Sequence, residues 1–147
     1  MRDVRLLAVA FDPGAEIDAF SAAHAEAGGV AAFAGKVRPT DGCEALELSH
    51  YEPLSLPGMA GLADQALTRF DLLGILLVHR VGVLLPGEPI VLAAAAARHR
   101  RSAIEAVDFA MDHLKSDAWF WKREKRADGW HWIEPRSEDH RDLARWN

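Results

Sequence analysis

Lysine is rare in this chain, and its distribution is uneven. Only four lysines occur beside thirteen arginines, and three of the four, Lys115, Lys122 and Lys125, lie within eleven positions of one another. Arginine keeps its proton near neutral pH, whereas a lysine can be tuned to act as an acid, a base or a nucleophile. Lysines kept in an arginine-rich chain therefore indicate proton-transfer chemistry, with codon bias as the alternative explanation.

Cationic side chains occur in three stretches where an apolar segment ends. The stretches are FAGKVR (33–38), ARHRRS (97–102) and LKSDAWFWKRE (114–124). In the second stretch, backbone N–H groups at a helix start would join His99 and Arg100 in holding an anion such as phosphate. In the third, an extended strand would put Lys122 on one face with Phe120 and Glu124.

Each of these residues also has a purely structural interpretation. Arg38, which precedes a proline, could be a solvated turn residue, and His99 could bond to the backbone. Lys115 could simply complement the dipole at the end of its helix. The tryptophans clustered between residues 119 and 132 favour packing or an interface over a platform for stacking bases.

Composition excludes several classes of protein. The chain has 147 residues, which predicts one domain over 1–147, and its net charge of −5 disfavours general nucleic-acid binding. Residues 98–126 nevertheless carry +3, which suits a small anionic ligand. With one cysteine and no HxH, HxxxH or HExxH spacing, neither a disulfide nor a zinc site is expected. No signal peptide or membrane-spanning run is evident, so we expect a cytoplasmic protein.

The element pattern predicts an α+β fold with a mostly antiparallel sheet, flanking helices and a C-terminal hairpin. Helices are expected over about 15–27, over about 55–70 with Pro57 near the start, from a Ser102–Glu105 capping box onward, and after Ser137. A strand over about 29–38 is expected to be buried, with 43–51 as its returning partner. Two strands covered on both faces are expected around the turn at 86–89, and a hairpin turn near 128–129.

Five blocks, in this order and spacing, resemble the large, catalytic subunit of molybdopterin synthase. They are FAGKVR, VHRVGVLLPGE, ARHRRSAIEAVDFAMDHLK, FWKRE and WHWIEPR, and the resemblance covers about residues 29–136. The chain departs from that family at Trp119, where proline is common, at Arg98, where a small residue is usual, and in a longer segment between Tyr51 and Met59.

The resemblance implies an α/β hammerhead fold and a sulfurtransferase without a metal or organic cofactor. Sulfur would come from the C-terminal Gly-Gly thiocarboxylate of a small ubiquitin-like partner and pass to cyclic pyranopterin monophosphate, giving the dithiolene of molybdopterin. The family's assembly is a heterotetramer around a homodimer of large subunits. Transferred by position, Lys115 and Lys122 are catalytic, and the substrate-binding residues are Lys36, Val37, Arg38, His99, Arg100, Arg123, Glu124 and Arg136.

Two other functions are considered from the same residues. The first is a non-catalytic module that binds a ubiquitin-like protein or a phosphate ligand through the basic stretches. The second, a single-stranded nucleic-acid binder that uses its tryptophans, is disfavoured by the acidic net charge.

Overall fold

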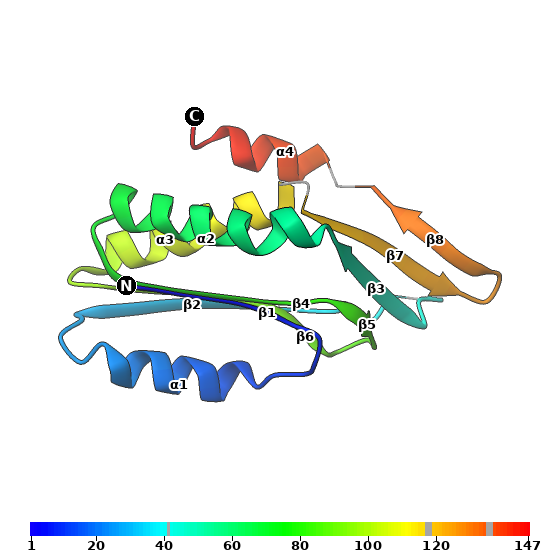
Figure 1. The fold of residues 1–147 in the computed structure, drawn as a ribbon, viewed down its shortest axis with the longest axis horizontal. Coiled ribbons are helices and arrows are strands. Elements are labelled where there is room, and N and C mark those ends of the chain that lie inside the picture. Colours follow the sequence, from blue (N-terminus) through cyan, green and yellow to red (C-terminus); the bar gives the residue numbers. More distant parts are fainter. Residues whose placement is uncertain (41, 117–118, 135–136) are drawn as a thin grey trace.

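A computed structural model describes residues 1–40, 42–116, 119–134 and 137–147. The chain alternates strands and helices around two four-stranded sheets (Figure 1). In chain order the elements are β1 (Arg2–Leu7), α1 (Pro13–Ala23), β2 (Gly29–Lys36), β3 (Ala45–His50), α2 (Glu52–Arg69), β4 (Leu72–Arg80), β5 (Gly82–Leu84), β6 (Pro89–Ala97), α3 (Arg100–Ser116), β7 (Phe120–Arg126), β8 (Gly129–Ile133) and α4 (Ser137–Ala144).

The first sheet has the strand order β1-β4-β6-β2, with α1 on one face and α2 and α3 on the other (Figure 1). Successive side chains of a strand point to opposite faces, so β4 sends Leu76 and Val78 towards Phe20 of α1, and Ile75 and Leu77 towards the α2–α3 side. The two central strands are therefore apolar almost throughout, as a sheet covered on both faces requires.

The second sheet, in the order β5-β3-β7-β8, extends from the side of the first, and all its pairs are antiparallel. Strands β7 and β8 form a hairpin in which Arg126 pairs with Gly129. Gly129 has a φ of +123°, a backbone conformation that glycine adopts without the steric cost other residues meet. Leu48 of β3 and Leu84 of β5 are buried in the same core as α2 and α3, which fastens the second sheet to the first.

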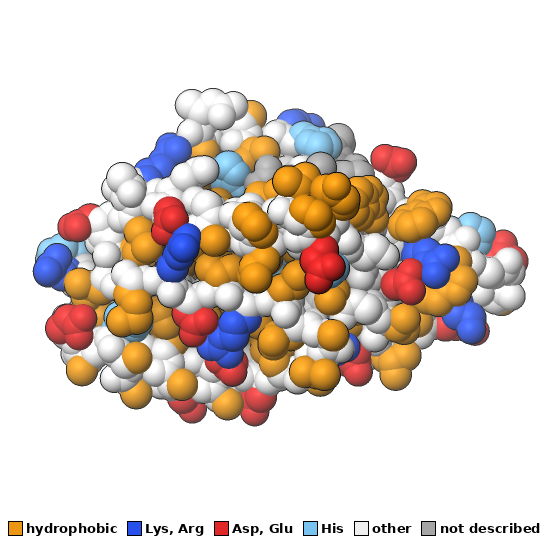
Figure 2. Space-filling model, in the orientation of Figure 1, with side chains coloured by type: hydrophobic (Ala, Val, Ile, Leu, Met, Phe, Trp, Pro, Cys, Tyr) orange, Lys and Arg blue, Asp and Glu red, His pale blue; other side chains and the backbone are white. Residues whose placement is uncertain are grey.

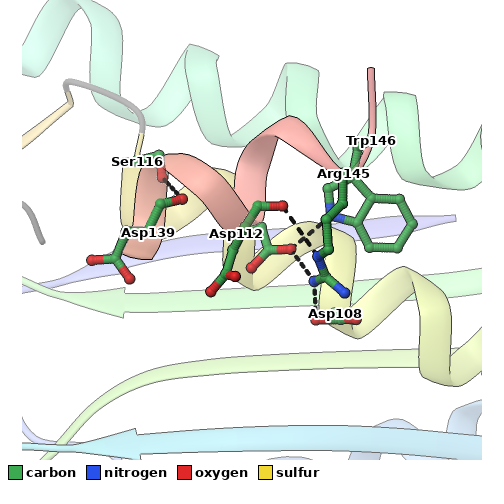
Figure 3. A network of polar contacts seen from close by, with 7 residues as sticks. Asp108, Asp112, Ser116, Asp139, Arg145 and Trp146 are labelled. Atoms are coloured by element: carbon green, nitrogen blue, oxygen red, sulfur yellow. Dashed lines mark hydrogen bonds and ion pairs between the residues drawn. The ribbon is translucent and has the colours of Figure 1, made fainter. Parts of the chain in front are cut away.

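The C-terminal helix α4 is fastened to α3 by a polar network (Figure 3). Asp112 of α3 accepts hydrogen bonds from Arg145 (2.5 Å) and from the Trp146 indole N–H (2.6 Å). Arg145 also pairs with Asp108 at 3.0 Å, and Ser116 donates to the backbone carbonyl of Asp139 at 2.8 Å. These bonds tie the last turns of α3, where Lys115 lies, to the end of the chain.

The predicted α+β class, the mostly antiparallel pairing, the flanking helices and the C-terminal hairpin are confirmed. The predicted pairing of segment 43–51 with the strand at 29–38 is wrong, because β3 pairs with β5 and β7 in the second sheet. Strand β2 instead pairs with β6 at the edge of the first sheet, so it is partly exposed.

Three local predictions also need correction. Ser102 does not cap its helix, because α3 already begins at Arg100. Pro57 lies inside α2, which begins at Glu52 with Pro53 in its first turn. The N-terminal segment, for which no element was predicted, forms β1, parallel to β4. Within the described ranges, no helix combines the length and apolar character needed to cross a membrane.

Candidate active site

Helix α3 carries predicted site residues at both of its ends. Arg100 is its first residue, His99 immediately precedes it, and Lys115 lies in its last turn. At 1.5 Å per residue, this 17-residue helix is about 24 Å long. His99 and Arg100 are therefore far from Lys115 in the same chain, and one chain alone does not bring these three residues together.

Strand β2 separates its residues in the same way. At its start, a Cβ added to Gly29 would lie 3.3 Å from the Arg100 Cα, and at its end Lys36 pairs with Pro89, the first residue of β6. Because α3 follows β6 and packs back along it, the C-terminal end of α3 lies over the beginning of β6 (Figure 1). Lys36 and Lys115 thus lie towards the same end of the first sheet.

Lys122 joins this end through β7. Lys122 pairs with Leu48 of β3 and lies two residues after Phe120 on β7. The Phe120 ring stacks on the imidazole of His79, with ring centroids 4.0 Å apart and an angle of 11° between the planes. Burial, together with the smaller effect of the positive charges of Lys122 and Lys115, lowers the pKa of His79 to about 4. Both lysines therefore lie near one buried ring at the end of β4.

The site residues thus form two groups, which we name by their places in the fold. The lysine end comprises Lys36, Arg38, Lys115 and Lys122. The arginine end comprises His99 and Arg100. Lys115 is exposed and Lys122 half-buried, while Val37, between Lys36 and Arg38, is 5% exposed. The lysine end is therefore an open cationic surface in the single chain.

Two predicted substrate-binding residues on β7 are engaged within the protein. Arg123 pairs with Glu47 at 2.6 Å, and its guanidinium lies over the rings of Trp130 (4.5 Å) and Trp132 (5.7 Å). Alternation along the strand puts this group on the face opposite Lys122. Glu124 shares the face of Lys122 but accepts a hydrogen bond from Arg126 at 2.7 Å.

Arg136, another predicted contact, lies outside the described residues.

Two hollows of the surface are lined by none of the predicted site residues. One, of about 130 Å³, lies between α1 and the first sheet and includes Arg5, Glu16 and His24 in its wall. The other, of about 470 Å³, lies beside Arg69 and Phe109. Across 1–40, 42–116, 119–134 and 137–147, no group of three or more His, Cys, Asp or Glu residues could hold a metal ion.

The sequence matches the family model described as MoaE protein over residues 8–117. A curated relative from Caulobacter vibrioides, named molybdopterin synthase catalytic subunit, is 47% identical over 138 residues, which cover 93% of this chain and 92% of the relative. The chain belongs to the MoaE family. Its membership confirms the resemblance and the prediction of an enzyme over the non-catalytic alternative.

Solved structures agree with the assignment to the MoaE family. The MoaE protein of Burkholderia ambifaria is 40% identical with a TM-score of 0.84, covering 99% of this chain and 98% of that one. A chain in the complex of subunits 1 and 2 of the Helicobacter pylori molybdopterin-converting factor has a TM-score of 0.77 at 22% identity, covering 91% and 92%. This second likeness is one of fold.

Trp119 and the segment between Tyr51 and Met59, both singled out in the sequence, lie against each other. Trp119 packs on α2 at Gly58, where an added Cβ would lie 2.4 Å from the indole Cε2. The Trp119 carbonyl also accepts a hydrogen bond from the Tyr51 N–H at 3.3 Å. The large ring at 119 and the segment before Met59 therefore form one packed contact, beside the connection between Lys115 and Lys122.

Residue-by-residue transfer from the MoaE family missed three residues at the lysine end. His79 and Arg80 close strand β4, and both are only 7% exposed. Glu88, on the turn before β6, pairs with Arg80 at 3.2 Å. The sequence does indicate that His79 and Arg80 are unusual, because they are polar residues at the end of an otherwise apolar strand. The pattern alone does not show which residues they contact.

Proposed function

We propose that this chain transfers sulfur from the thiocarboxylated C-terminus of a small ubiquitin-like partner to cyclic pyranopterin monophosphate, forming the dithiolene of molybdopterin. One observation carries the proposal. In a member of the MoaE family, Lys115 from a helix end and Lys122 from a strand lie near the same buried ring at one cationic end of the fold.

The reaction opens a cyclic phosphate and replaces oxygen by sulfur twice. Each replacement forms a carbon–sulfur bond and releases an oxygen that needs a proton or a neighbouring positive charge. Water then cleaves the bond between the sulfur and the partner's C-terminal carbonyl carbon, which leaves the partner as a carboxylate. Lys115, which lies exposed in the last turn of α3, acts as general acid and base on the group that enters from the partner. Lys122, half-buried on β7, stabilises the negative charge that develops.

A protein partner suits the surface beside the lysine end. Apolar side chains are exposed at the start of α2, Tyr51 by 50% and Leu54 by 53%, and on the hairpin, Trp121 by 47% and Trp132 by 65%. Figure 2 shows hydrophobic side chains gathered over these parts of the molecule. The related Helicobacter pylori protein is found in a complex of two subunits, which supports a small-subunit partner here. A thiocarboxylate tail would find fixed positive charge in Lys115 and Lys122.

A second copy of the chain would bring the two cationic ends together. Strand β2 lies at a sheet edge with Val30 (37%) and Phe33 (46%) exposed, a combination that favours pairing with another strand. If two copies paired antiparallel along β2 about a two-fold axis, the Lys36 end of one copy would meet the Gly29 end of the other. His99 and Arg100 of one copy would then face the lysine end of its partner.

In that arrangement the substrate phosphate lies between arginines of two copies. Arg38 comes from the copy that supplies the lysines, and His99 and Arg100 come from the other. Guanidinium groups hold phosphate through paired, charge-assisted hydrogen bonds, which suits the anion of the cyclic substrate. The homodimer thereby becomes the core of a heterotetramer with two small subunits.

The test is replacement of Lys115 in an assay with purified chain, cyclic pyranopterin monophosphate and thiocarboxylated partner. Lys115→Ala should nearly abolish dithiolene formation while partner binding, measured by calorimetry, is retained. Lys115→Arg keeps the charge but not a transferable proton, so it should also be nearly inactive. Near-normal turnover of Lys115→Arg would limit the residue to an electrostatic role, and near-normal turnover of Lys115→Ala would remove it from the mechanism.

A further inference from the structure

The end of strand β4 holds two buried polar residues that the proposed mechanism does not use. His79 and Arg80 are each 7% exposed, although the strand before them is apolar and its neighbour β6 is apolar throughout. Burying a guanidinium and an imidazole is costly unless their polar groups are satisfied, so their partners reveal what the strand end does.

Arg80 holds the turn that contacts the substrate-binding segment. Its Nη1 donates to Glu88 Oε2 at 3.2 Å, and the same carboxylate oxygen accepts the Leu85 N–H at 3.1 Å. From this turn, the Glu88 carbonyl accepts the Val37 N–H at 2.9 Å, and the Gly87 N–H donates to the Val37 carbonyl at 2.8 Å. The backbone of Val37, which separates Lys36 from Arg38, is thus held on both sides by a turn that Arg80 braces.

His79 holds the strand that carries Lys122. Its Nδ1 lies 2.8 Å from the Arg80 carbonyl, and since a carbonyl can only accept, Nδ1 carries the proton. This bond fixes the ring plane, and the ring stacks on Phe120 at 4.0 Å. Phe120 lies two residues before Lys122 on the same face of β7. The stack on His79 therefore fixes the position of the part of β7 that carries Lys122.

We propose that His79 and Arg80 are positioning residues: Arg80, through Glu88, sets the Lys36–Arg38 segment, and His79, through Phe120, sets the strand that bears Lys122. One strand end thereby fixes the spacing between the substrate-binding segment and a catalytic lysine. The proposal rests on the proposed function of these segments. It assigns substrate binding to Arg80 and the catalytic step to His79, so the two residues should affect KM and kcat respectively.

The first test replaces Arg80 by methionine, which is similar in length and uncharged. The ion pair is then lost, and the Glu88 carboxylate that remains is 37% exposed and therefore solvated. The Val37 amide should exchange with solvent about tenfold faster in Arg80→Met, measured by NMR, while the Leu77 amide in the middle of β4 stays unchanged. KM for the cyclic pterin should rise about tenfold with kcat within about twofold. Glu88→Gln, a second variant, should change both readouts in the same direction.

The second test separates stacking from simple packing at His79. His79→Leu removes the flat ring and should lower kcat about tenfold with KM within about twofold, whereas His79→Phe keeps a ring against Phe120 and should retain most of the rate. Asp64→Asn is the matched control, because it removes a surface ion pair with Arg2 (2.6 Å) away from the lysine end. The control should change neither constant.

The outcomes distinguish this proposal from the proposed function. Unchanged exchange at Val37 in Arg80→Met overturns the positioning role, and so does an apparent kcat that falls in proportion to a loss of folded protein while KM stays unchanged. An inactive wild-type chain overturns the proposed function alone, because the exchange measurement needs no turnover.

Discussion

The separation of the lysine end from the arginine end predicts that each active site is built from two copies of the chain. The perturbation is a pair of inactivating replacements at opposite ends of α3, Lys115→Ala in one copy and Arg100→Ala in the other. Each homodimer should be severely impaired, since every site lacks either its lysine or its phosphate-binding arginine.

The magnitude follows from the geometry of the helix and the symmetry of the dimer. Helix α3 is about 24 Å long, so Arg100 and Lys115 of one copy serve different sites. In a mixed dimer one site carries both replacements and the other carries neither. A mixed dimer should therefore recover about half of the wild-type rate.

The assay uses co-expression with two different affinity tags, sequential purification of the mixed dimer, and dithiolene formation with thiocarboxylated partner. A dimer of Lys115→Ala with Lys122→Ala is the matched control, because both residues lie at the same end and each site keeps one defect. That control should show no recovery. The shared site would be refuted if the Lys115→Ala/Arg100→Ala mixed dimer formed dithiolene no faster than the mean of the two homodimers from which it is made.

Two further predictions concern packing around the lysine end. Burial lowers the pKa of His79 from 6.5 to about 4, so between these values the unfolded chain binds a proton that the folded chain does not. The protonation of His79 should therefore lower the free energy of unfolding by about 3 kcal/mol as the pH drops from 7 to 4. Urea unfolding of His79→Phe at both pH values should show a fall in that free energy that is smaller by this amount. An equal fall in the wild-type chain and in His79→Phe would contradict the burial of the imidazole. Gly58→Ala places a methyl group against Trp119 and should destabilise by about 1–3 kcal/mol. Trp119→Leu in the same chain should recover part of that loss in a double-mutant cycle, and strict additivity would argue against the contact.

Periodicity and turn residues predicted those parts of the fold that depend on local sequence. The apolar runs of β4 and β6, the turn at Gly129 and the short last helix each carry their own signal. Which strand β3 pairs with is a non-local choice. Its alternation suits either sheet, and the buried Leu48 and Leu84, on segments far apart in sequence, decide in favour of the second.

The candidate site was predictable in its residue types but not in its spatial division. Lys115 and Arg100 each lie close in sequence to other cationic residues, and both belong to sequence blocks that resemble the MoaE family. The sequence alone therefore suggests that they belong to one site. Helical geometry places them at opposite ends, a consequence of where α3 begins and ends. Arg123 shows the converse case, since its family position suggests substrate contact while Glu47 and two tryptophans hold its guanidinium on the other face.

Four of the five tryptophans, Trp119, Trp130, Trp132 and Trp146, make separate packing contacts around the elements that carry the lysines. Trp119 fixes the segment after α3 to α2, and Trp130 and Trp132 hold Arg123 across the hairpin. Trp146 packs edge-on against Phe109 of α3, with ring centroids 5.5 Å apart. A lysine side chain is long and flexible, so placing its amine to within a fraction of an ångström requires a rigid backbone beneath it. Trp119 and Trp146 supply that rigidity beside the helix that carries Lys115, and the contact of Arg123 with Trp130 and Trp132 supplies it on the hairpin that carries Lys122, while Trp121 stays 47% exposed.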